Sequence, residues 1–220
     1  MSTVAILPIK SFGEAKQRLA HGLRPGPRRA LAEAMFSDVL VALRRTASID
    51  EVLVVSGDHG AQEIAGGYGA GVLDDQHRGH SAATLLGIAQ AMQTGTRRAL
   101  LVPGDCPLLD PEEVDALLAR PAGARSALIV PDRHGTGTNA LLLTPPDSLE
   151  PAFGPGSCQR HAAGARAERT AYEVVHVPTL ALDIDTPEDL EALQERLQTV
   201  HGGAAHTRGM LNQLNRSGFG

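Results

Sequence analysis

The sequence has little cysteine, and its two cysteines follow no metal-binding or disulfide pattern. Cys106 and Cys158 lie far apart in the chain, and no Cys-x-x-Cys pair is present. A disulfide framework and a structural zinc site are therefore not expected, and a reducing compartment fits this composition.

Long hydrophobic runs and an excess of positive charge are also missing. No stretch approaches the ~18 apolar residues of a membrane-spanning helix, and the first ten residues lack the basic and apolar segments of a secretion signal. The formal net charge is -5, whereas proteins that bind nucleic acids generally present a basic face. We therefore expect a cytoplasmic protein with neither a membrane nor a nucleic acid as its partner.

Two familiar catalytic motifs are absent as well. The chain contains no Gly-x-Ser-x-Gly segment, which is the nucleophile turn of many hydrolases. The glycine-rich stretch at 135–139 lacks the Lys-Ser/Thr of a phosphate-binding P-loop, and no helix is predicted after it.

The first half of the chain alternates short β-branched runs with helical patterns. Strands are predicted at 4–9, 51–57, 71–75 and 98–105, and helices at 28–46, 61–65, 81–93 and 111–119. This alternation is typical of a parallel sheet covered by helices on both faces.

The rhythm changes in the second half. Strands at 126–132 and 139–146 are too close for an intervening helix, one or two further strands are expected within 171–185, and a helix at 186–198 follows. The predicted fold is α/β and Rossmann-like, with a mixed, mostly parallel sheet. We expect one domain over residues 1–199 and a mostly disordered, glycine-rich tail over 200–220.

Asp105 stands at the carboxyl end of a predicted buried strand. Ligands of open parallel sheets bind at this edge. A turn or helix-cap role is the alternative, but Asp110 is better placed to cap the helix that follows. We therefore expect Asp105 to meet a cation or a ligand, because a buried unpaired carboxylate is costly.

Asp183 and Asp185 form a second acidic site. Alternate residues of a strand point to the same side, so the two carboxylates repel each other unless a cation lies between them. Helix capping can explain Asp185 or Thr186, but it does not explain Asp183. Carboxylates without nearby His or Cys favour Mg²⁺ over zinc, and Mg²⁺ commonly bridges to substrate phosphates. We expect magnesium, with two ions as the expected number.

Three loops could hold phosphates or other anions, although each also has an ordinary structural explanation. Gly135–Asn139, which includes Thr138, can turn its amides toward an anion or simply form a hairpin turn. Gly154 and Ser157 lie where a short helix is predicted to begin, a position that attracts phosphate. Lys10, Lys16 and Arg18 follow the first strand and could neutralise a triphosphate or simply be solvated.

Together these segments resemble a known family. The stretches LPIKSFGEAKQRL, VPGDCPLL, GTGTNALLL, FGPGS with a following histidine, and DIDTPEDL occur in that order over residues 3–198. They are similar to the guanylyltransferases of coenzyme F420 biosynthesis, which have a Rossmann-like nucleotidyltransferase fold. Those enzymes join GTP to 2-phospholactate, phosphoenolpyruvate or 3-phosphoglycerate.

The resemblance implies roles for particular residues. It places metal binding on Asp105, Asp183 and Asp185, and phosphoacid binding on Thr138, Gly154 and Ser157. It implies nucleotide binding at Pro8, Lys10, Lys16, Arg18 and Gly79, with Lys10 and Asp105 as catalytic residues. One departure is that Gly79-His80-Ser81 replaces the Gly-Leu-Asn of many relatives.

The reaction that the resemblance implies is magnesium-dependent transfer of a guanylyl group, with release of pyrophosphate. Expected partners are GTP and a small phosphorylated carboxylic acid, together with a homodimer and a hand-over of the product to the next F420 enzyme. The alternatives are a related nucleotidyltransferase that uses CTP or a phosphosugar, and a non-catalytic nucleotide-binding protein.

Overall fold

The centre of the molecule is a seven-stranded sheet in the order β3-β2-β1-β4-β6-β5-β7. The computed structural model describes residues 1–13, 16–21, 23–76 and 79–216. β6 runs antiparallel to β4 and β5, whereas the other neighbouring strands are parallel. This arrangement confirms the predicted mixed, mostly parallel sheet. The strands are β1 (Thr3–Pro8), β2 (Glu51–Val55), β3 (Gly71–Leu73), β4 (Arg98–Leu101), β5 (Ser126–Pro131), β6 (Thr138–Thr144) and β7 (Ala171–Val174).

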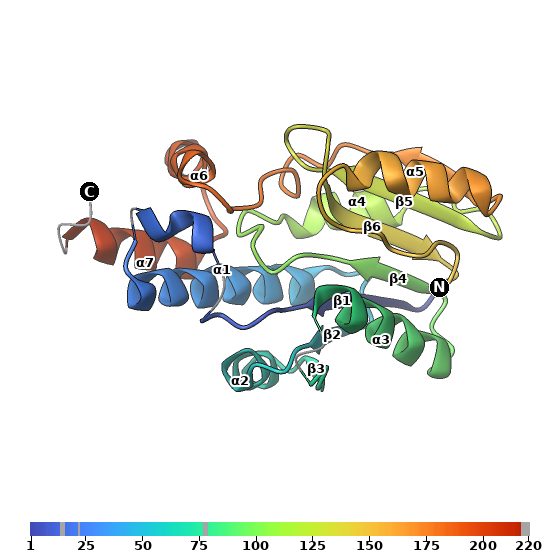
Figure 1. The fold of residues 1–220 in the computed structure, drawn as a ribbon, viewed down its shortest axis with the longest axis horizontal. Coiled ribbons are helices and arrows are strands. Elements are labelled where there is room, and N and C mark those ends of the chain that lie inside the picture. The colour runs from blue at the N-terminus through green and yellow to red at the C-terminus, as the bar shows by residue number, and fades with distance from the viewer. Residues whose placement is uncertain (14–15, 22, 77–78, 217–220) are drawn as a thin grey trace.

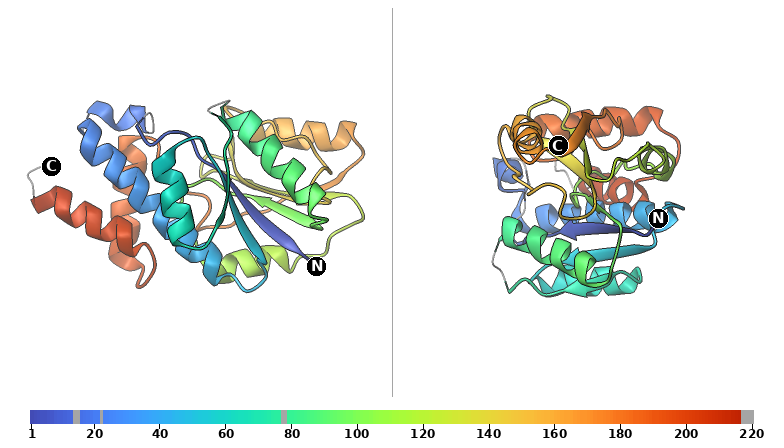
Figure 2. Two further views of the ribbon diagram at one scale, coloured as in Figure 1. Left: turned by 90° about the horizontal axis from the view of Figure 1, so that it is seen from below. Right: turned by 90° about the vertical axis from the view of Figure 1, so that its right-hand side faces the viewer.

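Helices cover both faces of the sheet (Figures 1 and 2). One core packs α1 (Pro25–Arg45), α2 (His59–Gly67) and α4 (Pro111–Leu118) against the strands. A second core, on the other face, contains α3 (His80–Gln93) and α5 (Ser157–Ala167). β1, β5 and β6 are buried along their whole length, which explains their near-continuous apolar sequence.

Local sequence signals fix where the helices near the cleft begin. Asp110 accepts the backbone N–H of Glu112 at 2.8 Å and caps α4, so Asp105 is not needed there. Thr186 and Asp189 form a reciprocal capping box at the start of α6 (Pro187–Thr199). Because Thr186 is the cap, the side chain of Asp185 remains available for other contacts.

Close packing of α3 on the sheet depends on one glycine. A Cβ added at Gly87 would lie 2.5 Å from Cγ2 of Ile6 in β1. Any larger residue would push α3 away from β1, and α3 begins at His80 beside the cleft described below.

Two expectations about the C-terminal part were wrong. Asp183 and Asp185 do not lie in a regular strand, because only β7 forms within 171–185. The segment is nevertheless extended, with Ile184 buried and its N–H donated to the carbonyl of Asp105 at 3.2 Å. The alternation of buried and cleft-facing side chains therefore survives without a strand.

The tail is also not disordered over its described part, because residues Ala205–Arg216 form α7. This helix packs along α1, and the views in Figures 1 and 2 place it at the end of the molecule opposite the N-terminus. The carboxylate of Asp38 in α1 accepts the N–H groups of His206 and Thr207 at 3.0 and 2.8 Å. Residues 217–220 of the predicted tail lie outside the described residues.

α7 completes a third hydrophobic cluster at the end of the sheet. The cluster joins the 3-10 helix η1 (Gln17–His21) and α1 to α6 and α7, and it includes Ile184. Sequence reasoning missed this helix because the glycines before it and its many polar residues hide three buried positions, Thr207, Leu211 and Leu214. Within the described residues, no helix is both long enough and apolar enough to cross a membrane.

Candidate active site

A cleft with two lobes lies at the edge of the sheet where β1 and β4 end and β6 begins. The first lobe has a volume of about 400 Å³ and the second about 440 Å³. Both lobes are lined by Pro8, Arg18, His80, Pro103, Asp105 and Asp185. The acids predicted at Asp105 and Asp185 therefore stand at the junction of the lobes.

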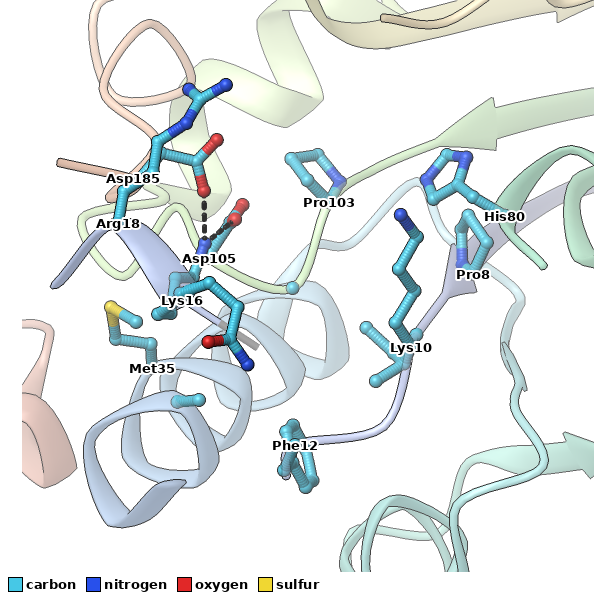
Figure 3. A pocket seen from close by; sticks show the side chains of 14 residues that line it. Pro8, Lys10, Phe12, Lys16, Arg18, Met35, His80, Pro103, Asp105 and Asp185 are labelled. Atoms are coloured by element: carbon cyan, nitrogen blue, oxygen red, sulfur yellow. Dashed lines mark hydrogen bonds and ion pairs between the residues drawn. The ribbon is translucent and has the colours of Figure 1, made fainter. Parts of the chain in front are cut away.

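Lys16 holds these two acids together. Its ammonium forms an ion pair with Asp105 and another with Asp185, the latter at 2.9 Å (Figure 3). The Lys16 side chain is only 8% exposed. Burial opposes its charge, but the two carboxylates outweigh this and raise the pKa of Lys16. The lysine is therefore a permanent cation in the cleft.

The backbone of Lys16 is unusual. Its φ of 57° lies in the left-handed region, which residues other than glycine seldom adopt. Such strain commonly marks functional positions, because the surrounding structure must enforce it. Here the strain accompanies the placement of the ammonium between two carboxylates.

Asp183 lines the second lobe, and its surroundings differ from those of Asp185. Burial and the nearby charge of Asp105 raise the pKa of Asp183 to about 6, although Asn139 donates a hydrogen bond to it at 3.1 Å. Burial also opposes the charge of Asp185, but Lys16 outweighs it and lowers the pKa of that carboxyl. The negative charges of Asp105 and Asp185 therefore act on Asp183, but only Asp105 and Asp185 contact the lysine.

The remaining predicted nucleotide residues gather mainly around the first lobe. Lys10 is exposed and extends toward His80 and Pro8, away from Lys16 (Figure 3). Lys10 and Lys16 are the only two lysines of the chain, and both line this lobe. Arg18 is near enough to Asp185 to lower its pKa. Gly79 precedes α3 with φ 92°, but within the described residues His80 lines the lobes and Gly79 does not.

The glycine-rich loop does turn its amides toward an anion, but that anion belongs to the protein. The carboxylate of Asp132 accepts the N–H groups of His134, Thr136 and Gly137 at 3.1, 2.9 and 2.9 Å. A Cβ at Gly137 would lie 2.6 Å from Asp132 Oδ2, so a larger residue there would displace the Asp132 carboxylate. These amides are therefore occupied, and the loop serves to place Thr138 and Asn139 in the second lobe.

Thr138, Gly154 and Ser157 come together in the second lobe. Ser157 is 1% exposed, and its Oγ is buried without a hydrogen-bond partner among the described residues. The first two amides of α5 already donate to the carbonyls of Gly154 and Thr136. The helix thus offers its dipole and the Ser157 hydroxyl, and not these two amides, to an anion in the lobe.

The acids fit a magnesium ion by their chemistry. Oδ1 of Asp105 is buried and lacks a partner within the described part of the chain. The atoms of the three acids that could ligate a metal are all oxygens, which magnesium prefers. The described residues contain no group of three acidic, histidine or cysteine side chains arranged around one metal position. Magnesium commonly binds through one or two carboxylates, and water and substrate phosphates complete its coordination. One or two of the acids in this cleft would therefore be enough.

Three contacts around the cleft were not predicted as site features. Asn139 orients Asp183 and also donates to the carbonyl of Leu180 at 2.8 Å. Arg133 pairs with Asp189 at 2.6 Å, which ties the β5–β6 loop to the start of α6. His161 bonds to Thr138 at 2.9 Å from within α5. Only the histidine that follows FGPGS gave a sequence signal, because the other two contacts depend on chain segments that meet only after folding.

Comparison with known proteins first defines the class. A solved structure from Desulfovibrio desulfuricans G20, provisionally described as a nucleotide-diphospho-sugar transferase, has a TM-score of 0.75 and 18% identity, covering 98% of this chain and 96% of that one. The fold is that of the α/β nucleotidyltransferases, and the cleft lies at the edge of the sheet where such folds bind ligands.

The particular family follows from sequence. Residues 3–217 match the model of the family described as "Guanylyl transferase CofC like", and the chain belongs to this family of nucleotidyltransferase enzymes. A phosphoenolpyruvate guanylyltransferase from Conexibacter woesei is 56% identical over 99% of this chain and 98% of its own length. A 2-phospho-L-lactate guanylyltransferase from Methanothermobacter thermautotrophicus is 32% identical over 97% of this chain and 92% of its own length.

Proposed function

We propose that this protein joins GTP to phosphoenolpyruvate and releases pyrophosphate. The observation that carries the proposal is the two-lobed cleft with Asp105 and Asp185 at its junction. One lobe holds both lysines of the chain, and the other holds the buried Ser157 hydroxyl and Thr138. This division suits a reaction in which a triphosphate and a second anionic substrate must meet.

In the proposed reaction, a phosphate oxygen of phosphoenolpyruvate attacks the α-phosphorus of GTP. The bond from the α-phosphorus to the bridging oxygen breaks, and pyrophosphate leaves with the electron pair. The attacking phosphate is already an anion near neutral pH, so no strong general base is needed. Positioning and neutralisation of charge therefore carry the catalysis.

The residues of the cleft have separate tasks in this scheme. Lys10, together with Pro8, Arg18 and the start of α3 at Gly79 and His80, binds the nucleotide, and Lys10 neutralises the departing pyrophosphate. Lys16 is held between Asp105 and Asp185 and keeps a positive charge where the two substrates meet. Thr138, Ser157 and the Gly154 turn hold the acidic substrate.

Asp105, Asp183 and Asp185 would hold magnesium, with two ions as the proposed number. When bound, the metal would neutralise charge on the phosphates of both substrates. The buried, unpartnered Oδ1 of Asp105 supports this part of the proposal.

Phosphoenolpyruvate is proposed over 2-phospholactate and 3-phosphoglycerate because the Conexibacter relative named for it is 56% identical over nearly the whole chain. The product would enter coenzyme F420 biosynthesis in the cytoplasm, by hand-over to the next enzyme. Both cysteines are free and buried, which suits a reducing compartment. A homodimer remains a prediction.

The test is pyrophosphate release in the presence of magnesium, GTP and each of the three phosphoacids separately. Release with phosphoenolpyruvate is expected. Release only with another acid would overturn the acceptor assignment, and activity only with CTP or with a phosphosugar would point to a related nucleotidyltransferase. No turnover by folded protein that still binds GTP would indicate a non-catalytic nucleotide-binding protein.

A further inference from the structure

His161 is completely buried yet takes no part in the scheme above. It lies in α5, and it is not among the described residues that line the two lobes of the cleft. Its two ring nitrogens each contact another polar group. Its Nε2 is 2.8 Å from the backbone N of Ala152, and its Nδ1 is 2.9 Å from Oγ1 of Thr138. The second contact reaches a residue that lines the second lobe.

The first contact decides where the ring carries its proton. The backbone N–H of Ala152 can only donate, so Nε2 of His161 must be the acceptor and carry no hydrogen. Burial and the charge of Arg160 lower the pKa of His161 to about 4, so the ring is neutral near pH 7. A neutral ring with a bare Nε2 has its hydrogen on Nδ1.

The direction of the Thr138 hydroxyl follows from this tautomer. Because Nδ1–H of His161 donates, Oγ1 of Thr138 must accept, and its own hydrogen has to point elsewhere. No other partner is found for Oγ1 among the described residues, and Thr138 lines the second lobe together with Ser157, whose Oγ is also unpartnered.

We propose that His161 is a positioning residue that makes the Thr138 hydroxyl a hydrogen-bond donor to an anionic group of the acidic substrate. The inference rests on the proposed function for the identity of that substrate. The orientation of the hydroxyl rests only on the contacts of His161. Phe153 packs edge-on against the ring at 5.2 Å between centroids and helps to hold it in place.

The first test reads the tautomer directly and does not depend on activity. Long-range ¹⁵N–¹H NMR of the full chain distinguishes Nδ1–H from Nε2–H rings, and His161→Gln assigns the signal among the nine histidines. We expect His161 to be neutral with its hydrogen on Nδ1. An Nε2–H ring or an imidazolium near pH 7 would overturn the proposal.

The second test separates positioning from packing by two matched variants. His161→Asn can place an amide N–H where Nδ1 stands, whereas His161→Gln can place a carbonyl oxygen where Nε2 stands but cannot donate to Thr138. We expect His161→Gln to raise KM for phosphoenolpyruvate about tenfold, with kcat and KM for GTP nearly unchanged. His161→Asn should recover most of that loss.

A double-mutant cycle with Thr138→Val completes the design. If His161 acts through the hydroxyl, His161→Gln adds nothing to the loss caused by Thr138→Val. Equal losses from His161→Gln in both backgrounds would overturn the proposal.

If the wild-type protein is inactive with every phosphoacid, the proposed function fails, but the inference about His161 can still be tested. The NMR measurement decides the orientation of the Thr138 hydroxyl, and isothermal titration of inorganic phosphate decides whether that hydroxyl binds an anion. No difference in phosphate affinity between wild type and Thr138→Val would then overturn it.

Discussion

At the scale of single residues, the two carboxylate oxygens of Asp105 have different surroundings in the cleft. One of its oxygens pairs with Lys16, and the other is buried without a partner in the described part of the chain. A buried oxygen in this state is costly unless something binds it when the protein works. The side chain is therefore suited to binding and contributes little to core packing.

Replacing Asp105 by Asn tests this interpretation. Asp105→Asn keeps the volume but removes the charge, so we expect pyrophosphate release to fall at least about a hundredfold. Asp110→Asn is the matched control in the same loop, because asparagine caps a helix about as well as aspartate. Near-normal turnover of Asp105→Asn would show that Asp105 has only a structural role in the turn. Circular dichroism checks that both variants remain folded.

The two lysines should differ sharply in chemical reactivity. Lys10 is exposed, whereas Lys16 is 8% exposed and held as an ammonium by two carboxylates. Amine acylation needs the neutral amine, so we expect a limiting amount of reagent to modify Lys10 and the N-terminal amine and to spare Lys16. Peptide mass spectrometry measures the modified fractions, and GTP should protect Lys10. Rapid modification of Lys16 would contradict the ion-pair arrangement.

At the scale of elements, α5 is attached to its neighbours through a histidine that must remain neutral. His161 bonds to the loop at Ala152 and to β6 at Thr138, and burial and Arg160 lower its pKa from 6.5 to about 4. The unfolded chain therefore binds a proton at His161 more readily than the folded one. Stability contributed by this group is complete above about pH 6.5 and is lost as the pH falls toward about 4.

This linkage predicts a measurable loss of stability in mild acid. The contribution of His161 at neutral pH is on the order of 2–3 kcal/mol, and roughly half or more of it should be lost by about pH 5. Urea unfolding of wild type and His161→Gln at about pH 7 and about pH 5 measures it. The wild type should lose more stability than the variant between these values. Equal losses would contradict the buried neutral ring.

At the scale of the whole molecule, α7 links the C-terminal segment to the cleft. Its buried leucines pack in the same cluster as Leu19 of η1, Met35 of α1 and Ile184. Ile184 lies between Asp183 and Asp185 in the chain. Lys16 and Arg18 lie just before Leu19 in the chain. The helix therefore supports the back of the site, although it contributes no residue to either lobe in the described chain.

Truncating one α7 side chain should show this support. Leu211 is 6% exposed, so Leu211→Ala is expected to lower the free energy of unfolding by roughly 2–5 kcal/mol. The exposed neighbour Asn212 is the control, and Asn212→Ala should change stability by less than about 0.5 kcal/mol. Denaturant unfolding measures both. Equal, small effects would mean that α7 does not pack as described.

The sequence by itself determined the sheet and most of its helices. Continuous apolar runs produced the buried strands, and the capping patterns at Asp110 and Thr186 fixed two helix starts. It also indicated that Asp105, Asp183 and Asp185 lie close together, and all three line the second lobe, although only Asp105 and Asp185 also line the first. Their shared role in binding metal remains a prediction.

Only the tertiary structure decided what these residues touch. Lys16 is far from both acids in sequence, and its position between Asp105 and Asp185 exists only in the folded chain. The anion of the glycine-rich loop proved to be Asp132, and the hydrogen of Thr138 is directed by His161. α7 was not predicted from the sequence because it is stabilised by long-range packing on α1 and by hydrogen bonds to Asp38, and local sequence patterns do not encode such contacts.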